Sequence, residues 1–407
     1  MRILVLHSRY RSAAPSGENN VVDAERALLS EAGHEVASWE RRSDDIAGWP
    51  IRQRVALPAR SVYHSAVRRE LAARLAATRP DVVHVHNTFP LLSPSVLDAC
   101  RDAAVPVVAT LHNYKLLCAS GDFFRAGSPC HDCADGAVLP GLLHGCYRGS
   151  RLATAPIAAG LVLNRSAWRQ RISAYVFISA AQRALMAGLQ LPAERVFVKH
   201  NASLSRPAPE ADRLHRVAYL GRLDAAKGIP FLTAAWDRYR VEHPRSPLRL
   251  AIAGDGPLAA EVRRWAAGHD RVDVLGHLTK EAAADLVAGS LAVVVPSSWE
   301  ETFGLVAVEA MAAGVAPVVP DRGSFPELVT DGVDGLHFRA GDLRSLAGRL
   351  AAIDAHPDRC QELGVRARQT HRDRFLPARN LAELLAIYQF AIDHPVDAAP
   401  TRATLPA

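Results

Sequence analysis

Short apolar runs alternate along this chain with longer amphipathic stretches. The runs in the first half are ILVL (3–6), VVHVH (82–86), VPVVAT (105–110) and YVFIS (175–179), and those in the second half are RVAYLG (216–221), LRLAIAG (248–254), VDVLG (272–276), LAVVVP (291–296) and APVVP (316–320). Helix-length stretches such as 21–33 and 65–77 lie between them. Continuous apolar runs separated by helices are typical of strands buried on both faces of a parallel sheet. The pattern therefore predicts an α/β protein.

A polar segment with two prolines, SLSRPAPEADRLH (203–215), separates the two halves and has the composition of a linker. We predict an N-terminal domain over 1–203 and a C-terminal domain over 214–375, each a Rossmann-like, doubly wound parallel sheet. Such sheets bind ligands at the carboxyl ends of their strands, so a cleft between the domains is the expected site. Residues 376–392 are predicted to form a helix that crosses back to the N-terminal domain, and 393–407 a disordered tail.

Composition and charge narrow the class of ligand. The 407 residues carry a formal charge of +6 and a pI near 9.1, which suits an anionic small molecule or an anionic membrane surface. No run of five basic residues occurs, which disfavours nucleic acid. The opening MRILVLHSRY is too short for a signal peptide or a bilayer span. We therefore expect a cytoplasmic protein, with peripheral contact at the inner face of the membrane compatible with its charge.

Two acids bracket an otherwise apolar run in SSWEETFGLVAVEAMAAG (297–314). Glu301 falls in the turn before a helix that begins near Gly304, and Glu309 falls one to two turns inside it. The first N–H groups of a helix suit an anion or sugar hydroxyls, and carboxylates accept hydrogen bonds from paired hydroxyls. The alternative is a first-turn helix acid and an ordinary surface acid.

A pair of cations strengthens the ligand-binding interpretation. YLGRLDAAKGIPFL (219–232) follows a strand and places Arg222 and Lys227 in a strand-to-helix turn. Two cations beside a helix N-terminus match the requirements of a diphosphate. Solvated loop charges are the alternative.

These segments carry a resemblance to a known family. GRLDAAKG (221–228), AGDGPL (253–258), VLGHL (274–278) and PSSWEETFGLVAVEAMAAG (296–314) are similar, in order and spacing, to the donor-binding half of retaining glycosyltransferases of the GT-B fold, family 4, which is marked by an E-x7-E pair. SGENNVV (16–22), HVHN (84–87), TLHN (110–113) and VKHNAS (198–203) resemble loops of its first domain. The likeness spans roughly residues 1–390.

The resemblance implies a nucleotide-diphosphate sugar as donor, with UDP or GDP as the nucleotide, and a hydroxyl acceptor in polysaccharide, cell-envelope or secondary-metabolite glycoside synthesis. Arg222 and Lys227 would neutralise the diphosphate, Glu309 would hold the ribose and Glu301 the donor sugar. The other implied donor-binding residues are Gly17, Gly254, Leu275, His277, Phe303, Gly304 and Leu305. His112 would face the anomeric carbon, with Glu18, His86 and Asn113 on the acceptor side; the implied catalytic residues are His112, Glu301, Arg222 and Lys227. A structural, non-catalytic role for His112 is the alternative.

The expected mechanism is same-face substitution, with catalysis resting on leaving-group electrostatics and domain closure. A double displacement like that of retaining glycosidases is disfavoured if Glu309 binds ribose. No DxD pair lies in a loop at the cleft, so the sequence requires no cofactor for catalysis. A same-fold epimerase, a phosphorylase and a non-catalytic nucleotide-sugar-binding protein are the alternatives. A dinucleotide-dependent dehydrogenase is disfavoured because no G-x-G-x-x-G follows a strand.

A cysteine-containing insertion over 113–150 interrupts the alternation in the first half. It holds four of the six cysteines of the chain in a C-x11-C-x2-C-x12-C spacing, namely Cys118, Cys130, Cys133 and Cys146. A C-x2-C pair with two further thiols in a loop rich in glycine and proline, which is expected to have little core of its own, favours a structural zinc site. His131 or His144 could replace one thiol, and unliganded cysteines are the alternative.

Overall fold

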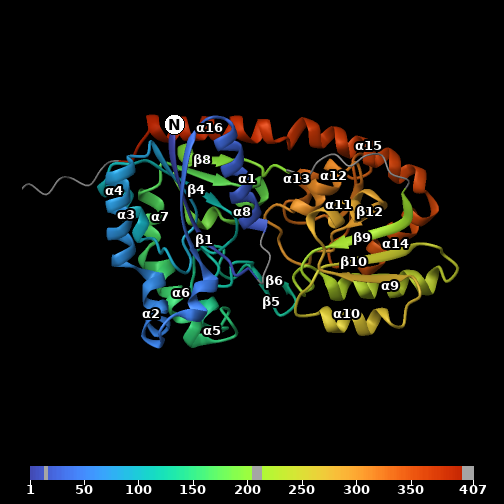
Figure 1. Cartoon of the computed structure of the whole chain (residues 1–407). Coiled ribbons are helices and arrows are strands. Elements are labelled where there is room, and N and C mark those ends of the chain that lie inside the picture. Colours follow the sequence, from blue (N-terminus) through green and yellow to red (C-terminus); the bar gives the residue numbers. More distant parts are fainter. Residues whose placement is uncertain (13–16, 204–212, 397–407) are drawn as a thin grey trace, which may run out of the picture.

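The computed structural model describes residues 1–12, 17–203 and 213–396 and contains two sheets of six strands each (Figure 1). Every strand pair in both sheets is parallel. Two parallel sheets in an α/β arrangement confirm the predicted fold class. Most of the predicted linker and of the predicted tail lies outside the described residues.

The first sheet is formed by the N-terminal half of the chain. Its strands, in spatial order, are β2 (Glu35–Arg42), β1 (Arg2–Arg9), β3 (Val82–Asn87), β4 (Val107–Leu111), β7 (Ala174–Phe177) and β8 (Val196–Val198). Its helices are α1 (Gly17–Glu31), α2 (Ile51–Val62), α3 (Ser65–Thr78), α4 (Ser95–Asp102), α5 (Leu139–Leu143), α6 (Arg151–Leu163), α7 (Arg165–Gln170) and α8 (Ala180–Leu185). The short antiparallel pair β5 (Phe124–Arg125) and β6 (Ser128–Pro129) lies in the cysteine-containing insertion.

The second sheet is formed by the C-terminal half. Its strands, in spatial order, are β11 (Val272–Gly276), β10 (Arg249–Ala253), β9 (Leu214–Leu220), β12 (Ser290–Val294), β13 (Ala316–Pro320) and β14 (Leu336–Phe338). Its helices are α9 (Ile229–Glu242), α10 (Ala259–Ala266), α11 (Lys280–Ala288), α12 (Leu305–Ala312), α13 (Phe325–Leu328), α14 (Leu343–Ala355) and α15 (Pro357–Arg374).

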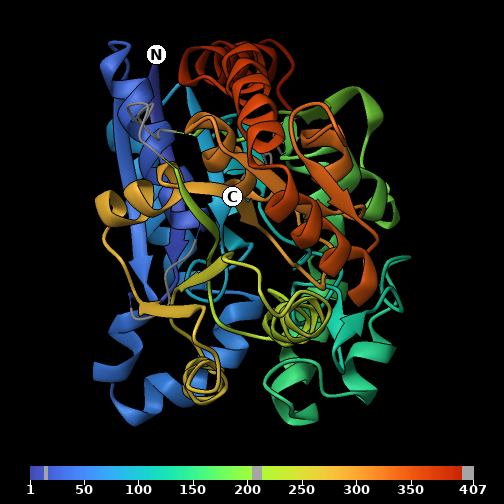
Figure 2. The ribbon, with the colours of Figure 1, turned by 90° about the vertical axis from the view of Figure 1, so that its right-hand side faces the viewer.

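The last helix, α16 (Pro377–Asp393), returns to the N-terminal half and packs against α1 and strands β3, β4 and β7. With α15 it runs along one side of both halves (Figures 1 and 2). Its buried Leu384, Ile387 and Tyr388 share a core with Ile3 and Val5 of β1. No helix in the described part of the chain is long and apolar enough to cross a bilayer.

Each sheet has one point at which the strand order reverses: between β1 and β3 in the first sheet, and between β9 and β12 in the second. Chains leaving neighbouring strands in opposite directions open a crevice at the carboxyl ends of those strands, and ligands of doubly wound folds bind there. In the second sheet the loops at this point hold Arg222, Lys227 and Glu301. In the first sheet Asn87 ends β3 at this point, and Glu18 lies in the first turn of α1, the helix that follows β1.

Candidate active site

An ion pair between a half-buried lysine and a buried glutamate occupies the switch point of the second sheet. Lys227, in the turn after β9, places its Nζ 2.6 Å from Oε1 of Glu301, in the loop after β12. The same oxygen accepts a hydrogen bond of 2.8 Å from the Ser297 hydroxyl. Burial opposes ionisation of Glu301, but the charge of Lys227 and these hydrogen bonds outweigh it and hold its pKa below the ordinary value. Lys227 also lies over the Trp299 ring, 5.1 Å from its centroid.

Arg222 is the more open of the two predicted cations. Its side chain is 56% exposed and its Nε pairs with Asp224. Asp224 also accepts a hydrogen bond of 2.8 Å from the backbone N–H of Lys227 and so fixes the turn that carries both cations. Asp224 was not among the predicted site residues, although an acid between the two cations of such a turn could have indicated its role.

Gly254, after β10, lies directly against this turn. A Cβ on Gly254 would come within 1.8 Å of the Gly221 carbonyl oxygen, and its φ of +142° is strained for any other residue. Leu275 lies near the end of the edge strand β11, His277 directly follows that strand, and both are exposed to solvent. The three predicted donor-side positions therefore lie at the carboxyl ends of two neighbouring strands of one sheet, β10 and β11.

Helix α12 begins at Leu305, with Gly304 in the left-handed conformation (φ +87°) as its N-cap. Phe303 is buried among the apolar residues that support the helix. The side chain of Glu309 is open to solvent on one side, yet the surrounding protein partly desolvates it and raises its pKa to about 7, an effect that Lys280 reduces. Glu309 is therefore an exposed carboxylate on α12, which a ligand can reach.

Two of the residues predicted on the acceptor side, His112 and His86, are in direct contact. His112, after β4, and His86, on β3, are both buried, and their Nε2 and Nδ1 atoms are 2.9 Å apart. Burial lowers the pKa of both imidazoles well below the ordinary value, so both are neutral at pH 7. A shared proton between two neutral rings fixes their orientation.

Glu18 and Asn113 also come together. The Asn113 side-chain amide donates to Oε2 of Glu18 over 3.1 Å, and the Tyr10 hydroxyl lies 3.4 Å from the same oxygen. Burial raises the pKa of Glu18 to about 7, against the opposing effects of Asn113 and the positive charge of Lys115. Gly17 opens α1 instead of lying in a loop, four residues before the predicted helix start at 21, because GENN continues into the helix with Glu18 as its first-turn acid. A Cβ on Gly17 would lie 3.2 Å from the Leu305 side chain, so the two predicted donor-binding positions face each other across the domains.

Residues 300–302 connect the two halves of the site. The Thr302 hydroxyl donates to the His112 carbonyl over 3.0 Å, the Ser179 hydroxyl donates to the Thr302 carbonyl over 2.7 Å, and the Tyr114 hydroxyl donates to the Glu300 carbonyl over 3.1 Å. The loop that carries Glu301 is thus anchored to the segment that carries His112. These contacts were missed because no local pattern in the sequence marks a hydrogen bond between residues 123 to 190 positions apart.

A cavity of roughly 1020 Å³, including its open mouth, extends from His86 and His112 into the N-terminal half. Pro156, Ile157 and Leu161 of α6 form part of an apolar wall. Lys115, Asn164, Arg165 and Arg169 contribute polar groups. No pattern in the sequence indicated this cavity, because its walls come from helices and loops that only the fold brings together.

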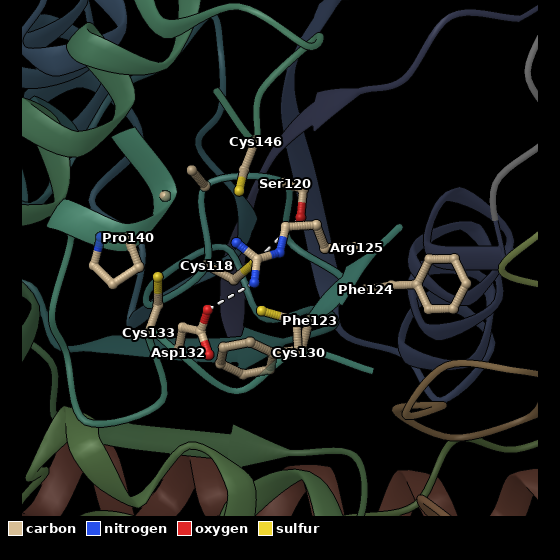
Figure 3. Close-up of a pocket in the computed structure, with 12 residues that line it drawn as sticks. Cys118, Ser120, Phe123, Phe124, Arg125, Cys130, Asp132, Cys133, Pro140 and Cys146 are labelled. Carbon is tan, nitrogen blue, oxygen red and sulfur yellow. Dashed lines mark hydrogen bonds and ion pairs between the residues drawn. The ribbon is translucent and has the colours of Figure 1, made fainter. Parts of the chain in front are cut away.

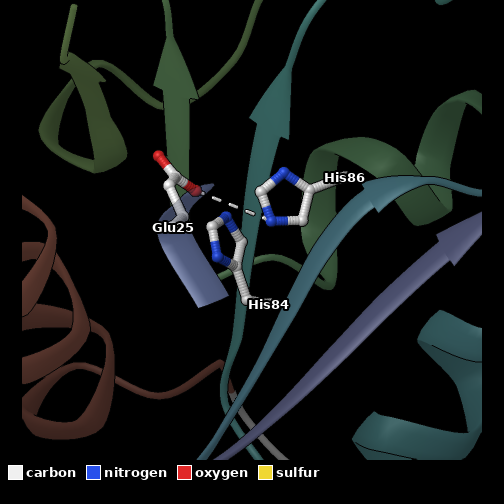
Figure 4. Close-up of side chains that lie close together, drawn as sticks. All are labelled: Glu25, His84 and His86. Carbon is white, nitrogen blue, oxygen red and sulfur yellow. Dashed lines mark ion pairs between the residues drawn. The ribbon is translucent and has the colours of Figure 1, made fainter. Parts of the chain in front are cut away.

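Glu25, His84 and His86 form the group of potential metal ligands whose atoms lie within 4.8 Å of one another among the described residues (Figure 4). Glu25 bonds the Lys199 ammonium at 2.7 Å. Both ring nitrogens of His84 are engaged, each at 2.7 Å, by the hydroxyls of Tyr388 and Thr110. The buried Lys199 ammonium beside Glu25 would repel a cation, and both nitrogens of His84 already have hydrogen-bond partners. We therefore interpret the group as a structural polar network.

Two Rossmann-like domains facing across a cleft, with polar loops at both switch points, are the architecture of GT-B glycosyltransferases. Family comparison agrees: residues 16–202 match the model of the glycosyl transferase 4-like domain, and residues 215–354 match that of glycosyl transferases group 1. The chain is therefore a glycosyltransferase of GT-B type, as the sequence motifs predicted.

Similar curated proteins cover part of the chain. The α-maltose-1-phosphate synthase of Mycolicibacterium smegmatis is 33% identical over 211 residues, 49% of this chain and 51% of that protein. The D-inositol 3-phosphate glycosyltransferase of Corynebacterium kroppenstedtii is 31% identical over 184 residues, 43% of this chain and 40% of that protein. In these matches the chain spans about half the length of its relatives, or less.

Solved structures agree over nearly the whole chain. Anabaena Alr3699/HepE in complex with UDP has a TM-score of 0.67 at 17% identity, covering 96% of this chain and 100% of that one. Sucrose-phosphate synthase from Thermosynechococcus elongatus has a TM-score of 0.70 at 18% identity, covering 96% and 98%. At these identities the likeness establishes the fold.

Proposed function

We propose that this chain transfers a sugar from a nucleotide-diphosphate donor to a hydroxyl of an acceptor, with retention of the anomeric configuration. The single observation that carries the proposal is the Lys227–Glu301 pair at the switch point of the second sheet, hydrogen-bonded through its loop to the His112 segment. A cation and a carboxylate at that place can hold a diphosphate and the sugar attached to it.

In the proposed reaction the bond between the anomeric carbon and the phosphate oxygen breaks, and the diphosphate keeps the electron pair. Lys227 and Arg222 stabilise that developing charge, together with the N-terminus of α12. The acceptor oxygen forms its bond on the face that the diphosphate leaves, and its proton passes to a diphosphate oxygen. Neutral His112 lines the cavity on the acceptor side, where it can orient a hydroxyl by hydrogen bonding.

Glu309 is the proposed ribose ligand. Its ionised carboxylate can accept two hydrogen bonds from neighbouring hydroxyls, and it is exposed to solvent on α12 of the donor half. Leu275 and His277 would border the base. UDP-sugars are the first donors to test, because Alr3699/HepE, which has this fold, was solved with UDP and with UDP-glucose.

The acceptor is proposed to carry an apolar part and to reside at a membrane. An apolar cavity beside His112 can receive such a part. Helices α2 and α5 both pack against α6, and the three helices lie together in the N-terminal half (Figure 1). On these three helices Ile51, Val55, Leu139, Leu143, Leu152 and Leu163 are between 52% and 89% exposed. We propose that these exposed apolar side chains on neighbouring helices form one interaction surface.

The positive charge of the segments that carry these helices favours an anionic lipid bilayer as the binding partner of this surface. Residues 46–69 and 136–172 contain no aspartate or glutamate but ten arginines. None of the residues of α2, all of which the structure describes, is buried. A basic, amphipathic face of this kind suits the headgroup region of an anionic membrane.

A panel of nucleotide diphosphates and nucleotide sugars tests the donor by thermal shift. A true ligand present at about 100 times its Kd stabilises the folded protein by about 2.7 kcal/mol. We expect one nucleotide to raise the melting temperature, and NMR of the product to give the same anomer as the donor. Absence of stabilisation by every nucleotide diphosphate at millimolar concentration contradicts the proposal. An inverted anomer overturns retention alone, and free sugar formed without acceptor points to the epimerase alternative.

A further inference from the structure

We infer that Cys118, Cys130, Cys133 and Cys146 bind one structural Zn²⁺ ion that holds the insertion together. All four line a single cavity of roughly 310 Å³, which includes its opening (Figure 3). They reach it from separate points of a segment of about 30 residues, and all are free thiols. This inference is independent of the proposed reaction.

The insertion has little regular secondary structure, although Tyr114, Leu117 and Phe123 pack into the core of the N-terminal half. Between Asn113 and Ser150 its regular structure amounts to the two-residue strands β5 and β6 and the five-residue helix α5. Local backbone hydrogen bonds place the cysteines: the Cys118 N–H donates to the Tyr114 carbonyl over 2.8 Å, and the Cys146 N–H to the Gly141 carbonyl over 3.0 Å. The stretches around the half-buried Cys130 and Cys146 would gain order from a crosslink to that core, and a zinc ion supplies one.

The donor set fits zinc. Four thiolates, two of them in a C-x2-C turn, match the closed tetrahedral sites of structural zinc. Among the described residues, no three of the four sulfur atoms all lie within 4.8 Å of one another. Zn–S bonds of about 2.3 Å would instead hold the sulfur atoms about 3.8 Å apart. A bound ion would therefore draw the four side chains into the cavity that they surround.

Neighbouring polar groups support an anionic centre there. A tetrathiolate zinc site carries a net negative charge, and the Arg125 guanidinium lies at the same cavity, 2.9 Å from Asp132 (Figure 3). The Ser120 hydroxyl lies 3.2 Å from the Cys118 sulfur. His131 and His144, the alternative ligands, do not line the cavity. His131 instead faces the donor half, with Nε2 3.5 Å from a carboxylate oxygen of Glu300.

The position of the site gives the ion a consequence for the active site. Ala119, next to Cys118, lines both the cysteine cavity and the large cavity beside His112. Tyr114 and His131 both belong to the insertion, and both contact Glu300, the neighbour of Glu301. The metal would therefore fix the wall between the acceptor cavity and the loop that carries the donor-side glutamate.

Metal analysis of the full chain, purified without chelator, tests the inference. We expect one zinc per chain, retained by the Cys100→Ala and Cys360→Ala variants, whose buried cysteines lie outside the insertion. Cys130→Ser and Cys133→Ser should lose it. Replacement by Co²⁺ should give the sulfur-to-metal charge-transfer absorption of a thiolate site in the unmutated chain, so the experiment does not depend on the variants folding.

Three results would overturn the inference. Folded protein with no zinc and no Co²⁺ thiolate spectrum excludes the site. Zinc that survives both cysteine substitutions lies elsewhere. Iron with visible absorption in place of zinc means that the four thiols hold an iron–sulfur cluster.

Discussion

The two halves of this glycosyltransferase arrange their polar groups by different means. In the C-terminal half, Arg222 and Lys227 share one turn, and Glu301 and Glu309 share one loop and helix, so short segments of sequence carry most of the site. In the N-terminal half, His86, His112 and Glu18 stand on three separate elements that only the fold brings together. The proposed diphosphate site needs only a compact set of groups, whereas a cavity of roughly 1020 Å³, including its open mouth, needs walls from many places.

Replacement of Lys227 by alanine should give the largest loss of activity among the variants of the donor half. Loss of one group that stabilises transition-state charge typically costs about 10²–10³ in kcat. Removal of Lys227 also leaves the buried Glu301 carboxylate unpaired, at about 1–3 kcal/mol of stability. Steady-state kinetics and thermal unfolding measure the two effects. Arg238→Ala, on the exposed side of α9, is the control and should change neither.

The double variant Lys227→Ala/Glu301→Gln separates the two consequences. It removes the unpaired charge, so the melting temperature should recover while turnover stays low. Near-normal turnover in the single variant would contradict the leaving-group role of Lys227.

Glu309→Gln should produce the next largest effect and should change the pH dependence of donor binding. Because burial raises the pKa of Glu309 to about 7, protonation should raise the donor KM up to about tenfold between pH 8 and pH 6. Glutamine should have a high KM at both pH values. Glu261→Gln, an exposed acid on α10, is the control, and a pH profile unaltered by Glu309→Gln would exclude Glu309 from the donor site.

Linkage gives Glu309 a second, independent readout. Its folded-state pKa lies above the ordinary value of 4.5, so the folded protein holds a proton that the unfolded chain releases between about pH 4.5 and 7. Relative to Glu309→Gln, the unmutated chain should therefore lose stability as the pH rises through that window. Urea denaturation at several pH values measures it.

Negative charges introduced on the exposed apolar residues of α2 and α6 should weaken membrane binding. Glutamates at Ile51, Val55, Leu152 and Leu163 should lower binding to phosphatidylglycerol vesicles at least tenfold, because each buries a charge in the interface instead of apolar area. Fold and turnover on a short water-soluble acceptor should persist, since all four side chains are exposed.

Val241→Glu/Val365→Glu is the matched control for that experiment. These valines are 81% and 69% exposed in the C-terminal half, and their replacement should leave vesicle binding unchanged. Equal binding of both variants, or equal binding of the unmutated chain to neutral and anionic vesicles, would contradict an anionic membrane as the occupant.

The sequence predicted the central strands and missed three of the four sheet edges. β1, β3, β9 and β12 are buried on both faces and read as continuous apolar runs. β2, β8 and β14 are edge strands: β2 has the sequence EVASWERR, mixed with charge, and the other two are three residues long. Edge strands need no continuous apolar run because one side has no neighbouring strand.

The same contrast applies to the site. The positions of Lys227 and Glu301 at the cleft followed from the order of strand, turn and helix, but their direct contact did not, because it joins residues 74 apart. The His86–His112 pair and the α6 wall depend on the relative placement of separate elements. Local patterns specify which loop reaches the crevice, and tertiary packing decides which side chains touch.

The contact between the halves should give the smallest effect. Tyr114 is buried, and its hydroxyl donates to the Glu300 carbonyl; Tyr114→Phe leaves that carbonyl unpaired at about 1 kcal/mol. If the bond only stabilises the fold, the melting temperature falls by about 2–4 °C and the kinetics persist. If it positions the donor loop against the acceptor cavity, as its place beside Glu301 indicates, the acceptor KM also rises two- to threefold while the donor KM stays constant.

Tyr175→Phe provides the comparison that distinguishes these outcomes. Tyr175 is equally buried, and its hydroxyl donates to the Trp168 carbonyl within the N-terminal half. Both variants should lose similar stability, since each removes one hydroxyl from a buried carbonyl. Only Tyr114→Phe should change the acceptor KM, because only its hydrogen bond crosses between the halves; equal kinetics in the two variants would mean that the acceptor cavity is shaped by the N-terminal half alone.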